Sequence, residues 1–311
     1  MSDQLIQIKN LSFAYEEHNN ILDDISIDIN EGEFVGIIGP NGAGKSTLIK
    51  IIAGLLQSNQ AKITLNGTHI SDYKPKQLAQ ILGYVPQKVE IPFSFTVHQV
   101  VEMGRFPYLQ GIFHQDVDTG QEVDKAMQRM DLIEMQNRSF STLSGGEQQR
   151  AIISSVLAQQ ARLMILISSV LAQQARLMIL DEPTSALDLK HQQGIYRILK
   201  RLADEEGKTI VIVTHDINLA AQFCERLILM DKGKIIADGP PDQVLQFQLI
   251  QQVYGVKVYI DVNPLTKSLY ILPLYVFTSL ERASLSPFFA FSTRIVSSKN
   301  QAFSIRLFEL L

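Results

Sequence analysis

The chain alternates short apolar runs with stretches of helical periodicity. Apolar and polar side chains alternate in the N-terminal runs at residues 5–8 and 21–29, a pattern typical of half-buried strands. Almost continuous apolar runs, which indicate buried strands, cover residues 33–38, 177–180 and 210–214. This pattern predicts an antiparallel β layer beside an α/β core.

Helical periodicity separates these strands and also fills a long central stretch. In residues 118–135 the apolar side chains Val123, Met127, Met130 and Leu132 fall on one side of a predicted helix. The segment from about residue 90 to 150 is therefore expected to be a helical insertion in an α/β chain. Further helices are predicted at residues 48–54, 78–82, 97–103, 189–203 and 217–223. Further strands are predicted at residues 62–65, 83–87, 226–230, 234–237, 257–260 and 270–272.

A glycine-rich loop follows the first buried run and fits G-x-x-x-x-G-K-[ST] without a mismatch. Its residues are Gly39, Pro40, Asn41, Gly42, Ala43, Gly44, Lys45, Ser46 and Thr47. Strand, glycine loop and helix together form a phosphate site, because the loop amides and the helix N-terminus face the anion. Lys45 is predicted to reach the β- and γ-phosphates, and Ser46 to offer its hydroxyl to Mg²⁺. The alternative, a glycine-rich turn with an incidental lysine, does not explain the flanking elements.

A second candidate for anion binding begins at residue 143, where Leu-Ser-Gly-Gly-Glu precedes a helical pattern. Ser144 is a predicted N-cap, with Glu147 as its capping-box partner. Serine and the glycines Gly145 and Gly146 at a helix start suit an anion, although a merely well-capped helix has the same pattern.

Two carboxylates follow the apolar run at residues 177–180, a placement that suits a metal site with a base beside it. Asp181 is predicted to hold Mg²⁺ together with Ser46, and Glu182 to orient the water that attacks the γ-phosphate. His215 ends the next buried run, where a γ-phosphate contact is expected at the carboxyl edge of the sheet. Gln87, at the exit of another strand, is a candidate contact to Mg²⁺ or to the attacking water.

Composition and charge exclude several classes of protein. The 311 residues are 46% hydrophobic and 19% charged, with a formal net charge of −4, which argues against a nucleic-acid binder. A single cysteine, Cys224, precludes an intramolecular disulfide and fits a reducing compartment. Residues 1–10 have no apolar core of a secretory signal. Uncharged apolar stretches such as residues 163–175 are shorter than the ~20 residues of a membrane helix.

In this order, the motifs of residues 1–250 resemble those of the ATP-binding cassette (ABC) ATPases. Residues 39–47 are similar to the Walker A loop, residues 177–182 to the Walker B strand with its catalytic glutamate, and residues 143–150 to the family signature. Ser185–Asp188 looks like the D-loop, Gln87 like the Q-loop residue, His215 like the switch histidine, and Tyr15 like the adenine-stacking aromatic. Without the resemblance, a core tyrosine is the other interpretation of Tyr15. The resemblance implies an α/β fold: a P-loop NTPase (RecA-like) core with an antiparallel β subdomain and a helical signature subdomain.

The resemblance also implies a mechanism and partners. Two copies dimerise head to tail, so that Ser144, Gly145 and Gly146 of one chain, with Asp188 nearby, close on the Mg-ATP of the other. Two membrane-spanning permease subunits dock near Gln87 and the helical insertion, and a substrate-binding protein acts indirectly. The phrases at residues 101–107, 215–221 and 253–256 resemble ATPases that import iron-siderophores, haem or cobalamin. Such a subunit lies peripherally on the cytoplasmic face of the inner membrane. The alternatives are a soluble ABC ATPase and a nucleotide-binding module that no longer hydrolyses ATP.

An identical tandem repeat departs from the family pattern. Residues 153–166 recur unchanged as residues 167–180, and such a lone duplication is no solenoid period. Lengthening the helix by one copy would displace its end by about 21 Å. We therefore expect the first copy to continue the signature helix and the second to supply the strand before Asp181, with about residues 162–175 leaving the core. In the competing register, residues 163–166 form the strand, and Ile167 and Ser168 replace Asp181 and Glu182.

The domain boundaries predicted from these patterns are residues 1–250 for the ATPase domain and 251–274 for its C-terminal strands. Residues 275–311 contain no glycine and no recognisable motif. We expect this tail to have no catalytic role.

Overall fold

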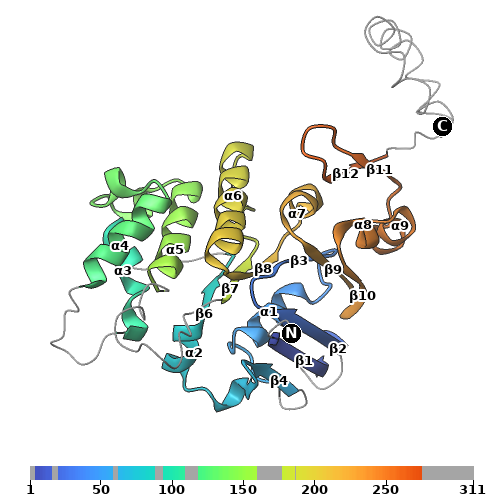
Figure 1. The fold of residues 1–311 in the computed structure, drawn as a ribbon, viewed down its shortest axis with the longest axis horizontal. Helices are drawn as coiled ribbons and strands as arrows, with labels where there is room; N and C mark the ends of the chain where they lie inside the picture. The colour runs from blue at the N-terminus through green and yellow to red at the C-terminus, as the bar shows by residue number, and fades with distance from the viewer. Residues whose placement is uncertain are drawn as a thin grey trace, which may run out of the picture. The chain divides into compact units, whose positions relative to one another are not determined.

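The computed structural model describes residues 4–15, 20–58, 62–87, 94–108, 118–159, 177–185 and 187–274. The chain divides into two compact units, Met1–Leu272 and Pro273–Leu311. The first unit contains the elements that position the site (Figure 1).

A six-stranded sheet forms the centre of this unit, in the order β10-β9-β3-β8-β7-β6. The strands are β3 (Phe34–Ile38), β6 (Leu82–Val85), β7 (Leu177–Asp181), β8 (Thr209–Val213), β9 (Arg226–Asp231) and β10 (Lys234–Gly239). All neighbours pair in parallel except β10 with β9. Every residue of β3, β7 and β8 is buried, as the continuous apolar runs predict. Because these strands are parallel, β3, β7 and β8 all end at the same edge of the sheet.

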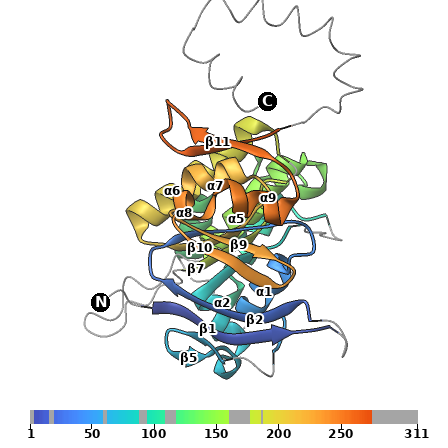
Figure 2. The ribbon, with the colours of Figure 1, turned by 90° about the vertical axis from the view of Figure 1, so that its right-hand side faces the viewer.

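An antiparallel sheet of four strands, in the order β2-β1-β4-β5, lies beside the six-stranded sheet (Figure 2). Its strands are β1 (Gln4–Phe13), β2 (Leu22–Asn30), β4 (Lys62–Leu65) and β5 (Thr68–His69). Ile25, Ile27 and Ile29 of β2 are buried, and the polar residues between them are exposed. The predicted antiparallel β layer is therefore confirmed.

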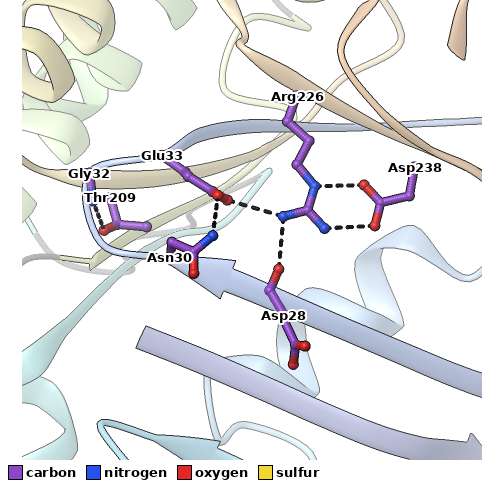
Figure 3. Close-up of polar contacts among 7 residues, drawn as sticks. All are labelled: Asp28, Asn30, Gly32, Glu33, Thr209, Arg226 and Asp238. Carbon is purple, nitrogen blue, oxygen red and sulfur yellow. Dashed lines mark hydrogen bonds and ion pairs between the residues drawn. The ribbon is translucent and has the colours of Figure 1, made fainter. Parts of the chain in front are cut away.

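Arg226, at the start of β9, joins the two sheets (Figure 3). Its guanidinium forms a bidentate pair with Asp238 at 2.6 and 2.7 Å and donates to the Asp28 carbonyl of β2 at 2.8 Å. It also contacts the Glu33 carboxylate at 3.2 Å, directly before β3. Planar, charge-assisted contacts of this kind are the strong ones among hydrogen bonds, so this cation fixes the entry of β3.

Two hydrophobic clusters cover the two faces of the central sheet. Val35 and Ile37 of β3 pack with α1 (Lys45–Ile52) and the antiparallel sheet. Phe34 and Ile38 pack on the opposite face with helices. These helices are α3 (Val97–Met103), α4 (Asp118–Arg129), α5 (Gly145–Gln159), α6 (Leu189–Glu206), α7 (Ile217–Phe223), α8 (Pro241–Val244) and α9 (Phe247–Tyr254). The alternation along β3 follows from the two-residue period of a strand.

The remaining elements include α2 (Pro75–Ile81), before β6, and the hairpin of β11 (Val258–Val262) and β12 (Leu269–Pro273). Short 3₁₀ turns cover Ile70–Asp72, Phe106–Tyr108, Ile133–Met135 and Phe140–Thr142. No helix among the described residues is both long enough and apolar enough to cross a membrane.

The single helix predicted for residues 118–135 is wrong in length. Helix α4 ends at Arg129, Asp131 takes a left-handed φ of 54°, and a 3₁₀ turn follows. Asp tolerates this conformation better than most residues. Met130 and Leu132, on either side of Asp131, are both still buried. The apolar periodicity therefore continues past the end of α4.

The two copies of the repeat contribute to different elements. Residues Ile153–Gln159 of the first copy belong to α5, and Leu177–Leu180 of the second copy form most of β7. This is the expected register. The excursion predicted for about residues 162–175 lies outside the described residues.

Candidate functional site

The glycine loop connects β3 to α1 and is shaped by close backbone contacts. Gly39 has a φ of 148°, and a Cβ there would lie 2.1 Å from the Met230 carbonyl oxygen. Gly44 has a φ of 94°, and its Cβ would lie 2.8 Å from the Ile21 carbonyl oxygen. Only glycine fits these two positions. Between them, Ala43 is buried, whereas Asn41 and Gly42 are exposed at the tip of the loop.

Lys45 closes the loop on itself. Its ammonium donates to the Gly39 and Pro40 carbonyl oxygens at 2.8 and 2.9 Å, and the side chain is almost fully buried. Burial lowers the pKa of Lys45, while the carboxylates of Glu182 and Asp181 act in the opposite direction. The predicted phosphate-binding cation therefore lies inside the loop and near both acidic residues.

Ser46 and Asp181 are brought together across two elements. The Ser46 hydroxyl, in the first turn of α1, donates to Asp181 Oδ1 at 3.0 Å, at the end of β7. Burial raises the pKa of Asp181, although the Ser46 hydrogen bond opposes this. A hydroxyl and a buried carboxylate are hard oxygen ligands, which Mg²⁺ prefers, and a cation would offset the cost of the buried charge. The pair therefore fits a magnesium ion.

Glu182 lies at the centre of the other predicted catalytic residues. The Gln87 amide donates to Glu182 Oε2 at 2.6 Å, and His215 Nε2 contacts the second carboxylate oxygen. Glu182 has a left-handed φ of 49°, and its amide donates to the Val213 carbonyl of β8 at 2.9 Å. Gln87, also predicted as a metal ligand, has no hydrogen bond to Ser46 or Asp181 within the part of the chain that the structure describes.

The signature residues lie at the start of α5, where the predicted capping box forms. Ser144 Oγ accepts from the Glu147 amide at 3.4 Å, and Glu147 accepts from the Ser144 amide at 2.7 Å. The Ser144 amide and the Ser144 hydroxyl, which donates to the same carboxylate oxygen at 2.9 Å, lower the pKa of Glu147, and the neighbouring Arg138 and Arg150 charges act in the same direction. Ser144 and Gly145 are exposed. No hydrogen bond among the described residues joins Ser144, Gly145 or Gly146 to the glycine loop of the same chain.

Tyr15, beside the glycine loop, and Asp188, at the start of α6, are both exposed. Tyr15 is 59% exposed, its ring meets Phe13 edge-on at 5.1 Å, and its hydroxyl lies 3.4 Å from Thr47 Oγ1. Such exposure beside the loop excludes the core role and leaves a face for a base. Asp188 caps α6, accepting from the His191 amide at 2.9 Å and contacting His191 Nδ1 at 2.7 Å.

Two residues that the sequence patterns did not single out adjoin this cluster. The Tyr84 hydroxyl of β6 is buried, and burial and then the Asp181 charge raise its pKa. Gln192, on α6, lines a small pocket together with Glu182 and His215. Neither residue belongs to a motif, and their sequence positions give no signal of these neighbours.

Two models of known protein families match parts of the chain. A family model described as "ABC transporter" matches residues 22–166. A second, described as "AAA domain, putative AbiEii toxin, Type IV TA system", matches residues 134–221.

Three curated relatives match most of the chain. The ferric enterobactin transport ATP-binding protein FepC of Escherichia coli is 33% identical, over 85% of this chain and 92% of its own. The hemin import ATP-binding protein HmuV of Vibrio anguillarum is 37% identical, over 83% and 94%. The uncharacterized ABC transporter ATP-binding protein YvrA of Bacillus subtilis is 36% identical over 81% of this chain, which spans only 54% of YvrA.

Two solved structures are similar over almost their whole length. The inward-facing conformation of "a putative metal-chelate type ABC transporter" has a TM-score of 0.72 and 26% identity, over 88% of this chain and 98% of that one. A dimeric post-hydrolysis ATP-binding cassette bound to ADP and Pi has a TM-score of 0.66 and 29% identity, over 76% and 99%. Together with the glycine loop, Walker B pair and capped signature helix, these similarities show that the chain belongs to the ATP-binding proteins of ABC transporters, a family of nucleotide-binding ATPases with a P-loop NTPase core.

Proposed function

We propose that this chain is the ATP-hydrolysing subunit of an ABC importer and acts as a head-to-tail dimer. The observation that carries the proposal is the cluster at the edge of the central sheet. There, Ser46 meets Asp181, and Glu182 is held between Gln87 and His215. The relative named as a hemin import ATP-binding protein supports the same direction of transport.

Each residue of the cluster has a part in phosphoryl transfer. The loop amides and the Lys45 ammonium hold the phosphates of ATP, and Tyr15 offers its exposed face to the adenine. Ser46 and Asp181 hold Mg²⁺, which neutralises phosphate charge, and Gln87 is a further candidate ligand. Glu182 orients and polarises the attacking water, while His215 contacts the γ-phosphate.

The proposed dimer brings the signature residues of one chain to the nucleotide of the other. Ser144 and Gly145 are exposed at a helix N-terminus, and the positive end of a helix attracts an anion. In the proposed dimer these residues and Asp188 close on the nucleotide held by the partner. One of the similar solved structures is a dimeric cassette.

The proposed membrane partners are two permease subunits, supported indirectly by a substrate-binding protein. Exposed apolar side chains on the helical subdomain, Met103 and the 70% exposed Phe106, offer a docking surface. The proposed cargo is an iron chelate, haem or cobalamin, and the subunit works peripherally at the cytoplasmic face of the inner membrane. A soluble ABC ATPase would not co-purify with polytopic membrane proteins, and an importer subunit does.

The proposal is tested by measuring Mg-ATP binding and phosphate release on the same preparation. Lys45→Ala is expected to weaken binding by about 100-fold, because it removes a charge-assisted phosphate contact. Glu182→Gln is expected to bind ATP, to lose at least about 100-fold in turnover, and to elute as an ATP-dependent dimer. A wild-type chain that binds no Mg-ATP, or a Glu182→Gln variant that stays monomeric, overturns the proposal.

The repeat supports a second candidate, a nucleotide-binding protein with impaired hydrolysis. The "ABC transporter" family match ends at Leu166, the last residue of the first copy. A strand formed by that copy would be followed by Ile167 and Ser168 instead of the two carboxylates. Normal Mg-ATP binding without phosphate release from the wild-type chain identifies this case.

A further inference from the structure

The loop that follows β7 holds Glu182 at one end and Asp188 at the other. Among its described residues, the hydrogen bonds within the loop belong to turns. Ser185 donates its amide to the Glu182 carbonyl at 3.2 Å, and Leu187 donates its amide to the Thr184 carbonyl at 3.2 Å. Turns of this kind do not by themselves fix a loop against its neighbours, since they connect the loop only to itself.

The side chain of Gln192 ties this loop to α6. Its Nε2 donates to the Thr184 carbonyl oxygen at 3.1 Å. Within the described residues, no other side-chain hydrogen bond reaches the backbone of this loop. Helix α6 is a firm support, because Tyr196 and Leu199, one and two turns further on, are fully buried in the core.

The loop that Gln192 bonds contacts both the predicted catalytic residues and the signature helix. Glu182, two residues before Thr184, lies with Gln192 and His215 around one small pocket. At the other end, the Leu187 side chain packs against the signature helix so closely that a Cβ on Gly146 would lie 3.1 Å from Leu187 Cδ2. A shift of the Thr184 backbone would therefore move the Glu182 carboxylate and disturb the packing of Leu187 against the signature helix.

We propose that Gln192 is a positioning residue for ATP hydrolysis: its amide fixes the Thr184 carbonyl and thereby holds Glu182 and Leu187 in place. This inference rests on the proposed ATPase function. Gln192 has no hydrogen bond to Lys45, Ser46 or the glycine loop among the described residues, so we expect its loss to leave nucleotide affinity almost unchanged. A misplacement on the order of 1 Å can cost about 100-fold in rate. Loss of one neutral hydrogen bond removes only part of this positioning, and we expect about a tenfold effect.

The test compares Gln192→Met with Gln193→Met in the full chain. Methionine keeps the length of glutamine but cannot donate. Gln193 is the matched control, because it is exposed and its one side-chain hydrogen bond among the described residues is from Arg197, at 3.4 Å. Gln192→Met is expected to lower kcat about tenfold, with KM for Mg-ATP and the melting temperature unchanged, and Gln193→Met to leave all three unchanged. Equal kcat values for the two variants overturn the inference.

A second measurement separates positioning from a structural role. If Gln192 acts through Glu182, Gln192→Met has a much smaller effect on turnover in a Glu182→Gln chain than in the wild type, whereas an undiminished effect overturns the inference. Gln192→Asn, whose amide is too short to reach Thr184, gives the same loss if Gln192→Met folds poorly. A wild-type chain without ATPase activity defeats the proposed function instead, and an active wild type with a silent Gln192→Met defeats only the role of Gln192.

Discussion

Two strand–loop–helix units build the site, and they are specified in different ways. In the phosphate unit, β3, the glycine loop and α1, the shape is set by close steric contacts such as that between Gly39 and the Met230 carbonyl. In the hydrolysis unit, β7, the loop at 182–188 and α6, the position is set by polar contacts of Asp181, Glu182 and Thr184. Residues 177–180 of the strand in this second unit have an identical copy at residues 163–166.

This difference shows which of the two units can form in more than one register. The apolar residues of β7 are the same in both copies, so their packing between β6 and β8 favours neither register. Only the residues after Leu180 distinguish the two, through the hydrogen bonds of Asp181 and Glu182. The phosphate unit has no such competitor, because its motif occurs once.

Gly39→Ala probes the steric specification and has the largest expected effect on stability. The new Cβ would approach the Met230 backbone oxygen to 2.1 Å, and we expect a loss of about 3 kcal/mol in the free energy of unfolding. Gly42→Ala is the control: its Cβ meets open space, and only the left-handed φ of 79° costs about 1 kcal/mol. Urea denaturation measures both, and equal losses would show that the close contact is not what requires glycine.

Deletion of residues 153–166 removes the competing strand from the hydrolysis unit. If the two registers were equally populated, turnover would rise about twofold. The deletion also shortens the chain between Gln159 and Leu177 to about a fifth of its length, which lowers the entropy cost of folding by about 1.5 kcal/mol. This corresponds to a rise of about 3 °C in melting temperature. Phosphate release and thermal melting are measured side by side. No change in either contradicts the two-register interpretation.

Asp181→Asn has the smallest expected effect on stability. Unlike most substitutions in a functional site, it is expected to stabilise the chain. A raised folded-state pKa means that the protonated carboxyl stabilises the fold below the unfolded-state pKa, and that this contribution is lost as pH rises through the folded-state value. Asn cannot ionise, so the variant melts at a higher temperature than the wild type at pH 7 without Mg-ATP. The gain shrinks toward pH 4, and a gain independent of pH speaks against a buried charge.

The sequence predicted the elements and the local chemistry of the site better than its cross-connections. Residues 217–223 form the expected helix, and Ser144 and Glu147 form the expected capping box, because both are specified by neighbours in the chain. The helix at 118–135 was too long, since a left-handed Asp131 leaves the apolar periodicity intact.

The contacts made by Arg226 and Gln192 could not be predicted from patterns. Arg226 meets Asp28, Glu33 and Asp238 only after β2, β3 and β10 have come together around β9. Gln192 is one of two consecutive glutamines, and only the packing of α6 decides which of them faces Thr184. Likewise, Lys45 donates to the carbonyls of its own loop, a contact that the motif does not specify.

The position of β3 between β8 and β9 has a consequence for synthesis of the protein. The Gly32 amide, just before β3, donates to the Thr209 hydroxyl, which lies 177 positions further along the chain. Non-local pairings of this kind slow folding. The strand that carries the phosphate loop is among the first parts to leave the ribosome, yet it remains without its neighbours until most of the polypeptide has been made.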